Sequence, residues 1–206
     1  KMLNIPLVYI STAGIFDGNK NEYDETDEPI PPAPLSIYGK SKYAGELAAR
    51  TWPKSIIIRA GWMIGGGPKK DKKFVNKIIK QLNSGARELA VVADKLGTPT
   101  YTYDLASTIE HLLEHGHYGL FHGSCDGGGS RYEVALHILD CLNLKQKIQT
   151  KVVSSDHFKE TYFAPRPASE RLSNKKLKAV NADLTRDWHE CLKEYLEKFD
   201  WDIKDA

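Results

Sequence analysis

The sequence predicts an α/β fold built around a parallel sheet, and three observations support this prediction. Residues 5–10 and 55–59 are short apolar runs rich in β-branched side chains, as in strands buried on both faces of a sheet. Segments with helical periodicity lie between and after them, and alternating strands and helices are typical of parallel sheets. The chain has 206 residues, 41% hydrophobic and 27% charged, which fits a globular protein of one domain or one and a half small ones.

The first half of the chain contains three predicted strands and two predicted helices. In chain order they are a strand at 5–10, a polar loop with Pro31, Pro32 and Pro34, a helix at 38–51, a strand at 55–59, a glycine-rich loop at 65–68, a helix through 74–82 and a strand at 88–93. Pro53 ends the first of these helices, because proline cannot continue a helix. The second helix is identified by apolar residues that recur at helical spacing.

The second half continues the alternation of helices and strands. Its predicted elements are a loop with Gly97 and Pro99, an amphipathic helix at 103–114, a short strand at 120–122, a helix at 131–142, an edge strand at 150–153 and a last helix with Trp188, Leu192, Tyr195, Leu196 and Phe199 on one side. Ser130 is a suitable N-cap for the helix at 131–142. The sequence contains no internal repeat and no linker that would separate the parts cleanly.

Charge and cysteine content exclude several classes of function. The formal net charge is only +2, and no apolar run is long enough to cross a bilayer, so we expect neither nucleic acid nor a membrane as a partner. Three widely spaced cysteines, Cys125, Cys141 and Cys191, support neither a disulfide framework nor a thiolate zinc site. His111 and His115 have metal-compatible spacing, but no nearby ligand completes a set, so we predict no metal. The first residues lack a signal peptide, and we expect a cytoplasmic protein.

Tyr38 and Lys42 are the strongest candidates for catalysis. They are four residues apart on a predicted helix and therefore share one face. A free tyrosine, with a pKa of about 10, is a weak acid near neutral pH, and a nearby ammonium group favours the phenolate. The pair could then move a proton to or from a carbonyl oxygen. A lone Tyr-x-x-x-Lys spacing is common and usually structural, so its context decides the interpretation.

That context includes Ser11 and Thr12 at the end of the first predicted strand. Ligands of parallel α/β sheets bind beyond the carboxyl ends of the strands. A hydroxyl group there could hydrogen-bond the same carbonyl oxygen and stabilise developing charge. The order of strand, Ser-Thr, proline-rich loop and Tyr38–Lys42 at the start of a helix is much rarer than either motif alone, and it favours a catalytic role.

Motifs along most of the chain resemble extended short-chain dehydrogenases, and the dTDP-4-dehydrorhamnose reductase family most closely. The resemblance covers roughly residues 5–200. The segments that carry it are Ser11-Thr12, Phe16-Asp17-Gly18, Pro34-Leu35, Tyr38-Gly39-Lys40-Ser41-Lys42, Gly45-Glu46, Arg59-Ala60-Gly61-Trp62, Asp94 to Thr100, Asp104-Leu105-Ala106, Pro165-Arg166-Pro167, Leu172-Ser173 and Leu177. This family has a doubly wound, Rossmann-like parallel sheet with a smaller α/β substrate-binding subdomain, and the resemblance implies that the chain is the C-terminal part of that fold.

The resemblance also implies roles for individual residues. The catalytic residues would be Thr12, Tyr38 and Lys42. The contacts with an NADP or NAD cofactor would be Ser11, Tyr38, Lys42, Ala60 and Gly61. The contacts with the substrate, a nucleotide sugar, would be Ala13, Trp62, Phe74 and Arg166. A guanidinium group can bind a diphosphate through two parallel hydrogen bonds, which suits Arg166 physically.

The chain departs from the family pattern in three places. Ala13-Gly14 stands where the family often has Asp-Tyr, and Ala168-Ser169-Glu170 replaces the usual Asn-Ser pair, so the identity of the sugar is open. No glycine-rich phosphate turn follows a strand near the start. We therefore expect the cofactor-binding half to be absent and this chain alone to bind cofactor weakly. A homodimer, or a partner segment that supplies the missing half, stays open.

The resulting prediction is reduction of a nucleotide-linked 4-keto-6-deoxy sugar by hydride transfer from NAD(P)H. Two alternatives remain: a nucleotide-sugar epimerase or dehydratase of the same superfamily, and a non-catalytic sugar-nucleotide-binding or regulatory subunit. Residues 1–117 would form mainly the later part of the Rossmann-like domain, with about 62–96 extending toward the substrate. Residues 118–206 would form mainly the substrate-binding subdomain and the C-terminal helix.

Overall fold

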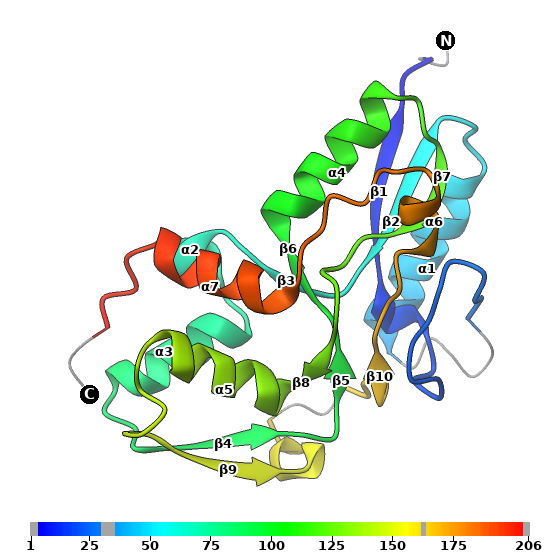
Figure 1. Ribbon diagram of the computed structural model, residues 1–206. Coiled ribbons are helices and arrows are strands. Elements are labelled where there is room, and N and C mark those ends of the chain that lie inside the picture. Colours follow the sequence, from blue (N-terminus) through cyan, green and yellow to red (C-terminus); the bar gives the residue numbers. More distant parts are fainter. Residues whose placement is uncertain (1–3, 30–35, 162–163, 204–206) are drawn as a thin grey trace.

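The computed structural model describes residues 4–29, 36–161 and 164–203, and their chain folds into two parts joined by short strands (Figure 1). The expected loop prolines Pro31, Pro32 and Pro34, and the Pro34-Leu35 pair, lie outside the described residues. One part is built on a parallel sheet and carries Tyr38 and Lys42 on a helix beside it. The other is dominated by three helices and a pair of long strands.

The first part is a three-stranded parallel sheet covered on both faces. Its strands are β1 (Leu7–Thr12), β2 (Ser55–Ala60) and β7 (Gly119–His122), in the order β1-β2-β7. Every residue of β2 is buried, because helices lie on both sides of it. α1 (Ile37–Arg50) packs against β1 and β2, whereas α4 (Thr102–Glu114) and α6 (Lys175–Ala179) pack against β2 and β7. Parallel strands and alternating helices confirm the predicted α/β class.

The faces of β2 follow the two-residue period of a strand. Ile56, Ile58 and Ala60 pack with Leu105 of α4 and Leu177 of α6 in one hydrophobic cluster. The residues between them point to the other face, where Arg59 reaches α1. This alternation places an apolar core on the α4 side and a charged network on the α1 side of the same strand.

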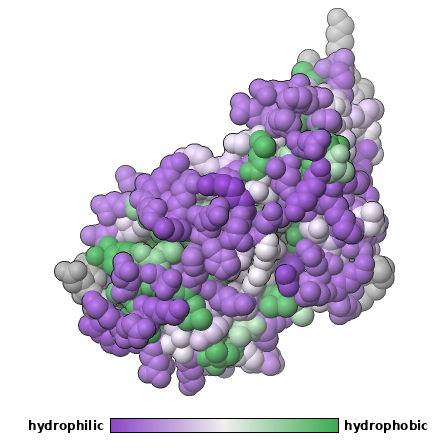
Figure 2. All heavy atoms as spheres, in the orientation of Figure 1, coloured by the Kyte–Doolittle hydropathy of each residue, from purple (hydrophilic) through white to green (hydrophobic). Residues whose placement is uncertain are grey.

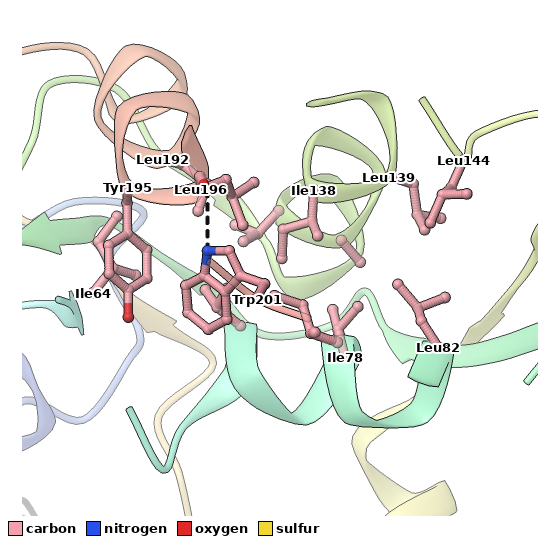
Figure 3. Packing of buried hydrophobic residues seen from close by; sticks show 14 of the residues in the cluster. Ile64, Ile78, Leu82, Ile138, Leu139, Leu144, Leu192, Tyr195, Leu196 and Trp201 are labelled. Carbon is pink, nitrogen blue, oxygen red and sulfur yellow. Dashed lines mark hydrogen bonds between the residues drawn. The ribbon is translucent and has the colours of Figure 1, made fainter. Parts of the chain in front are cut away.

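The second part packs three helices over the parallel pair β4 (Glu88–Val92) and β9 (Gln149–Val153). The helices are α3 (Phe74–Asn83), α5 (Arg131–Cys141) and α7 (Trp188–Lys198). Their apolar faces form the larger hydrophobic cluster, in which Ile78, Ile138 and Leu192 come from one helix each (Figure 3). The indole of Trp201 donates a hydrogen bond to the Leu196 carbonyl at 3.1 Å and packs within this core (Figure 3).

Short strands connect the two parts. β3 (Trp62–Ile64) pairs with β6 (Pro99–Tyr101), and β5 (Leu96–Gly97) lies between β10 (Ser169–Glu170) and β8 (Gly129–Ser130). A short helix, α2 (Gly67–Lys70), follows β3, and 3₁₀ turns occupy Ala13–Ile15 and Ser155–Phe158. These short strands bring residues from distant parts of the sequence to the junction of the two parts.

The structure confirms the positions of the predicted long elements and corrects three details. β1, expected to be buried on both faces, stands at the end of the strand order β1-β2-β7, and most of its residues are only half-buried. The predicted loop with Gly97 and Pro99 contains the strands β5 and β6. The strands and helices agree with their expected positions to within about two residues, the usual uncertainty at element ends. The glycine-rich residues 65–68 do not form only a loop, because a helix begins at Gly67. Pro68 lies in the first turn of that helix, where a backbone N–H has no helical partner and proline is tolerated. Ser130 caps α5 through a full capping box with Glu133.

The surface is mainly hydrophilic on the face drawn in Figure 2, with hydrophobic residues in small groups. Among the described residues, none of the helices combines the length and the hydropathy needed to span a membrane.

The two parts are interleaved in sequence, since β7 and α6 follow residue 117 yet pack in the first part. The division at residue 117 therefore remains a prediction about where most of each part lies.

Candidate active site

Thr12 lies at the carboxyl end of β1, the edge where ligands of parallel α/β sheets bind. Its Oγ1 accepts a hydrogen bond from the Gly14 N–H at 3.2 Å, which caps the 3₁₀ turn that follows. An oxygen held in this way keeps its own O–H for donation. In the parallel register Thr12 is the neighbour of Ala60, so the ends of β1 and β2 lie side by side.

Tyr38 and Lys42 lie on the first two turns of α1. Ser36 starts the helix by accepting a hydrogen bond from the Gly39 N–H at 3.1 Å. The Tyr38 side chain is 51% exposed, so its phenol is accessible to a ligand. α1 contacts the 3₁₀ turn directly after Thr12, which brings this helix to the carboxyl end of β1.

Lys42 is held in place by Tyr9 of β1. The Lys42 ammonium group lies 4.5 Å from the centre of the Tyr9 ring, within the range of a cation–π contact. The Tyr9 hydroxyl donates a hydrogen bond to the Lys42 carbonyl at 2.9 Å. Both contacts fix the position of Lys42 relative to β1. The role of Tyr9 was not predicted, although its position two residues before Ser11 on the same strand face could have suggested it.

Ser11 belongs to a buried charged network. Its hydroxyl donates a 2.6 Å hydrogen bond to Glu46 of α1, and the same carboxylate accepts bonds from Arg59 of β2 at 2.8 and 3.2 Å. Burial would raise the pKa of Glu46, but the hydrogen bonds and charge of Arg59 outweigh it and hold that pKa below its ordinary value. The Ser11 hydroxyl is therefore engaged within the fold. A cofactor contact by Ser11 stays a prediction that its side chain does not support.

Ala60 and Gly61 are predicted to contact the cofactor. Ala60 ends β2 beside Thr12, and Gly61 follows it. Ala60 is 2% exposed and faces the α4 core, so its side chain offers little surface. The Gly61 N–H donates to the Thr100 hydroxyl at 2.9 Å. A side chain at Gly61 would collide with the Thr98 carbonyl at 2.1 Å, so only glycine allows this approach of backbones. Both residues lie at the expected edge, and their contact with a cofactor stays a prediction.

Trp62, the first residue after that edge, is the centre of a second cluster. Its indole N–H donates a 2.9 Å hydrogen bond to Glu170 of β10. The guanidinium of Arg131, the first residue of α5, lies 3.6 Å from the centre of the Trp62 ring and 5.0 Å from that of Phe74. The structure thus brings the predicted residues Trp62 and Phe74 together around an arginine that was not singled out.

Gly14 links this cluster to Thr12. A Cβ atom added to Gly14 would lie 3.2 Å from Oε1 of Glu170 and 3.5 Å from Oγ1 of Thr12. The Glu170 carboxylate therefore extends from Trp62 almost to the end of β1. Glu170 and Gly14 are two of the positions where the chain departs from the family pattern, and those departures were the sequence signal for this contact.

Arg166 and Ala13 differ in their surroundings. Arg166 is exposed, and its charge is near enough to help lower the pKa of Arg131. Ala13 is 1% exposed and packs with Ile15 and Phe16, so its role as a substrate contact stays a prediction without exposed surface to support it. The described residues contain no group of three histidine, cysteine or acidic side chains arranged to hold a metal ion.

The chain is similar to several known proteins. It is 37% identical over 192 residues to the spore coat polysaccharide biosynthesis protein SpsK of Bacillus subtilis, covering 93% of this chain and 64% of SpsK. The structure matches dTDP-4-dehydrorhamnose reductase of Yersinia enterocolitica with a TM-score of 0.84 and 37% identity, over 93% of this chain and 66% of that one. It matches the Bacillus anthracis reductase, solved in complex with NADP, with a TM-score of 0.83 and 34% identity, over 94% and 66% of the two chains.

These matches agree in the fold and in the share of each known protein that the chain covers. The chain spans slightly less than two thirds of the length of each of these proteins. Residues 1–201 match the sequence profile of one family, described as the RmlD substrate binding domain. Because that match covers nearly the whole sequence, the chain belongs to the RmlD substrate binding domain family.

Proposed function

We propose that this chain carries the proton-transfer and substrate-binding residues of a reductase that converts a nucleotide-linked 4-keto-6-deoxy sugar with NADPH or NADH. The observation that supports this most is the grouping of Thr12, Glu170 and Trp62 near the helix of Tyr38 and Lys42. The Glu170 carboxylate is bonded to the Trp62 indole, and both it and the Thr12 hydroxyl lie beside Gly14 in the turn that α1 contacts. Two of the similar structures are dTDP-4-dehydrorhamnose reductases, and one of these was solved with NADP. A dTDP-linked keto-sugar is therefore the first substrate to test.

The chain's own residues would act on the carbonyl oxygen of the sugar. Tyr38 would donate its phenolic proton to that oxygen, and the Lys42 ammonium, one helical turn away, would stabilise the phenolate that remains. The Thr12 hydroxyl would donate a hydrogen bond to the same oxygen, because its lone pair already accepts the Gly14 N–H. Trp62 and Glu170 would contact the sugar on the side away from α1.

A nicotinamide cofactor fits the end of the sheet where these residues gather. The ends of β1 and β2 are adjacent, and Tyr38 is half-exposed in the first turn of α1, the helix that contacts the turn after β1. Tyr38 and Lys42 would hold the nicotinamide end of the cofactor. When bound in reduced form, the cofactor supplies the hydride that the carbonyl carbon accepts.

The decisive experiment is the substitution Tyr38→Phe in the full-length protein. With dTDP-4-dehydrorhamnose and NADPH or NADH, loss of the phenolic proton should lower kcat by about 10²- to 10⁴-fold. Circular dichroism should show an unchanged fold, because the Tyr38 ring is exposed. Tyr43→Phe, on the same helix but turned toward the Phe16 cluster, is the matched control and should keep its rate. A Tyr38→Phe protein that turns over like the wild type would contradict the assignment.

Two other functions remain as alternatives. An epimerase or dehydratase would change the sugar without net consumption of reduced cofactor, so product analysis in parallel with cofactor oxidation separates it from a reductase. A non-catalytic subunit would bind the nucleotide sugar but turn over none of a panel of keto-sugars. The reductase proposal requires stoichiometric oxidation of NAD(P)H.

A further inference from the structure

Arg131 is unusual among the well-packed arginines of this chain. Its guanidinium is half-buried between the rings of Trp62 and Phe74, at 3.6 and 5.0 Å from their centres. Among the described residues, no side chain or carbonyl accepts a hydrogen bond from it. By contrast, Arg59 donates to Glu46, and Arg186 donates to Asp104 and Glu194. The five N–H donors of an arginine are costly to leave unused in a partly buried place.

The electrostatics of this place favour an anion. Burial lowers the pKa of Arg131 to about 10, the charge of Glu170 opposes this shift, and the like charge of Arg166 adds to it. Arg131 therefore remains a cation at neutral pH, and the charge of the exposed Arg166 reaches it. Glu170 is the nearest acid, but its carboxylate is bonded to the Trp62 indole and forms no ion pair with Arg131. Two cations that repel each other are stabilised by a ligand with more than one negative charge.

The order of contacts along the cluster gives that ligand a position. Starting from the end of β1, the side chains lie in the order Thr12, Glu170, Trp62 and Arg131. Thr12 and Glu170 face each other across Gly14, and each later side chain contacts the one before it. In a hexose ring, carbon 4 and the anomeric carbon lie at opposite ends. A sugar with its 4-keto oxygen at Thr12 would therefore direct its anomeric oxygen, and the diphosphate attached to it, toward Arg131.

We propose that Arg131, together with Arg166, binds the diphosphate group of the nucleotide sugar. The flat faces of Trp62 and Phe74 orient the guanidinium so that its N–H edge can donate two parallel hydrogen bonds to phosphate oxygens. The stack also reduces the rotamer freedom lost on binding. This inference rests on the proposed function for the position of the sugar, but the diphosphate contact can be measured without any turnover.

The test is calorimetric binding of dTDP and of thymidine to the wild type and to Arg131→Gln. Loss of charge-assisted hydrogen bonds should weaken dTDP binding by roughly 10- to 100-fold while thymidine binding stays unchanged. Arg131→Lys keeps the charge but loses the planar guanidinium group, so its affinity for dTDP should lie between those of the wild type and Arg131→Gln. The control is Arg87→Gln, which changes the exposed arginine directly before β4 and should bind dTDP like the wild type.

Each outcome separates this inference from the reductase proposal. Equal dTDP affinity in the wild type and Arg131→Gln would overturn the inference even if the protein reduces a keto-sugar. Equal weakening of dTDP and thymidine would also overturn it, because it would indicate that Arg131 only supports the packing of Trp62. A selective loss of dTDP binding supports the inference even if no keto-sugar is turned over, in which case only the reductase proposal fails.

Discussion

The buried carboxylate of Glu46 should be one of the most sensitive positions of the fold. It is completely buried, and it accepts hydrogen bonds from Ser11, Arg50 and twice from Arg59, which is itself completely buried. Glu46→Ala leaves the Arg59 charge in the core with the Asp27 carbonyl as an acceptor at 2.9 Å and only the half-exposed Glu28 carboxylate, at 3.7 Å, as a counter-charge. Removing one partner of a buried ion pair costs about 3–5 kcal/mol, so we expect a loss of unfolding free energy in that range.

Urea unfolding followed by tryptophan fluorescence measures this loss directly. Glu28→Ala is the matched control, because Glu28 binds Arg50 in the same network but has a half-exposed side chain. It should cost no more than about 1 kcal/mol. The pair Glu46→Leu with Arg59→Met should recover much of the stability, since it removes both charges at similar volume. If Glu46→Ala unfolds at the same urea concentration as Glu28→Ala, the buried pair of Glu46 and Arg59 does not stabilise the fold more than an exposed pair does.

The Glu46 carboxylate should also make the free energy of unfolding depend on pH. Its pKa in the folded protein lies below the ordinary value of 4.5. Below that ordinary value the unfolded chain binds a proton that the folded chain does not. The contribution of Glu46 is therefore complete above pH 4.5 and is lost as the pH falls through the folded pKa. Glu46→Gln should remove this part of the acid sensitivity.

Two further predictions concern other positions. Burial and the charge of Arg59 lower the pKa of His122 to about 3, so between pH 6.5 and 3 the imidazole is protonated in the unfolded chain but not in the folded one. As the pH is lowered through this range, the unfolding free energy should decrease by up to about 1.4 kcal/mol per pH unit. His122→Gln should reduce that decrease, measured by urea unfolding at a series of pH values. A Cβ at Gly97 would lie 2.2 Å from the Trp62 ring, so Gly97→Ala should displace the indole and raise KM for the nucleotide sugar in steady-state assays; an unchanged KM would exclude Trp62 from the substrate site.

The sequence predicted the first part of the fold well because its signals are local. The strands β1 and β2 are continuous apolar runs, and α1 and α4 have clear periodicity, so composition and spacing suffice for them. The two-residue strands β5, β8 and β10 carry no such signal. They form because residues distant in sequence meet at the junction, and a run of two residues has no period to detect.

The candidate site shows the same contrast. Thr12, Tyr38, Lys42 and Trp62 stand in recognisable motifs. The structure places Thr12 at the end of β1, Trp62 two residues after the end of β2, and Lys42 of α1 against Tyr9 of β1. In the sequence, Arg131 is recognisable only as the first helical residue after the N-cap Ser130. Its contact with Trp62 joins positions 69 residues apart in sequence, and nothing in the local pattern could reveal it.

The interleaved path of the chain limits how the two parts can move. After α3 and β4 in the second part, the chain returns to the first through α4 and β7, leaves it again for α5, and comes back at α6 before ending on α7 (Figure 1). A hinge between the parts would have to bend all of these crossing segments together. Substrate entry should therefore depend on side-chain and loop rearrangement around Trp62 rather than on opening of whole lobes, and neither part can be excised as one continuous stretch of sequence.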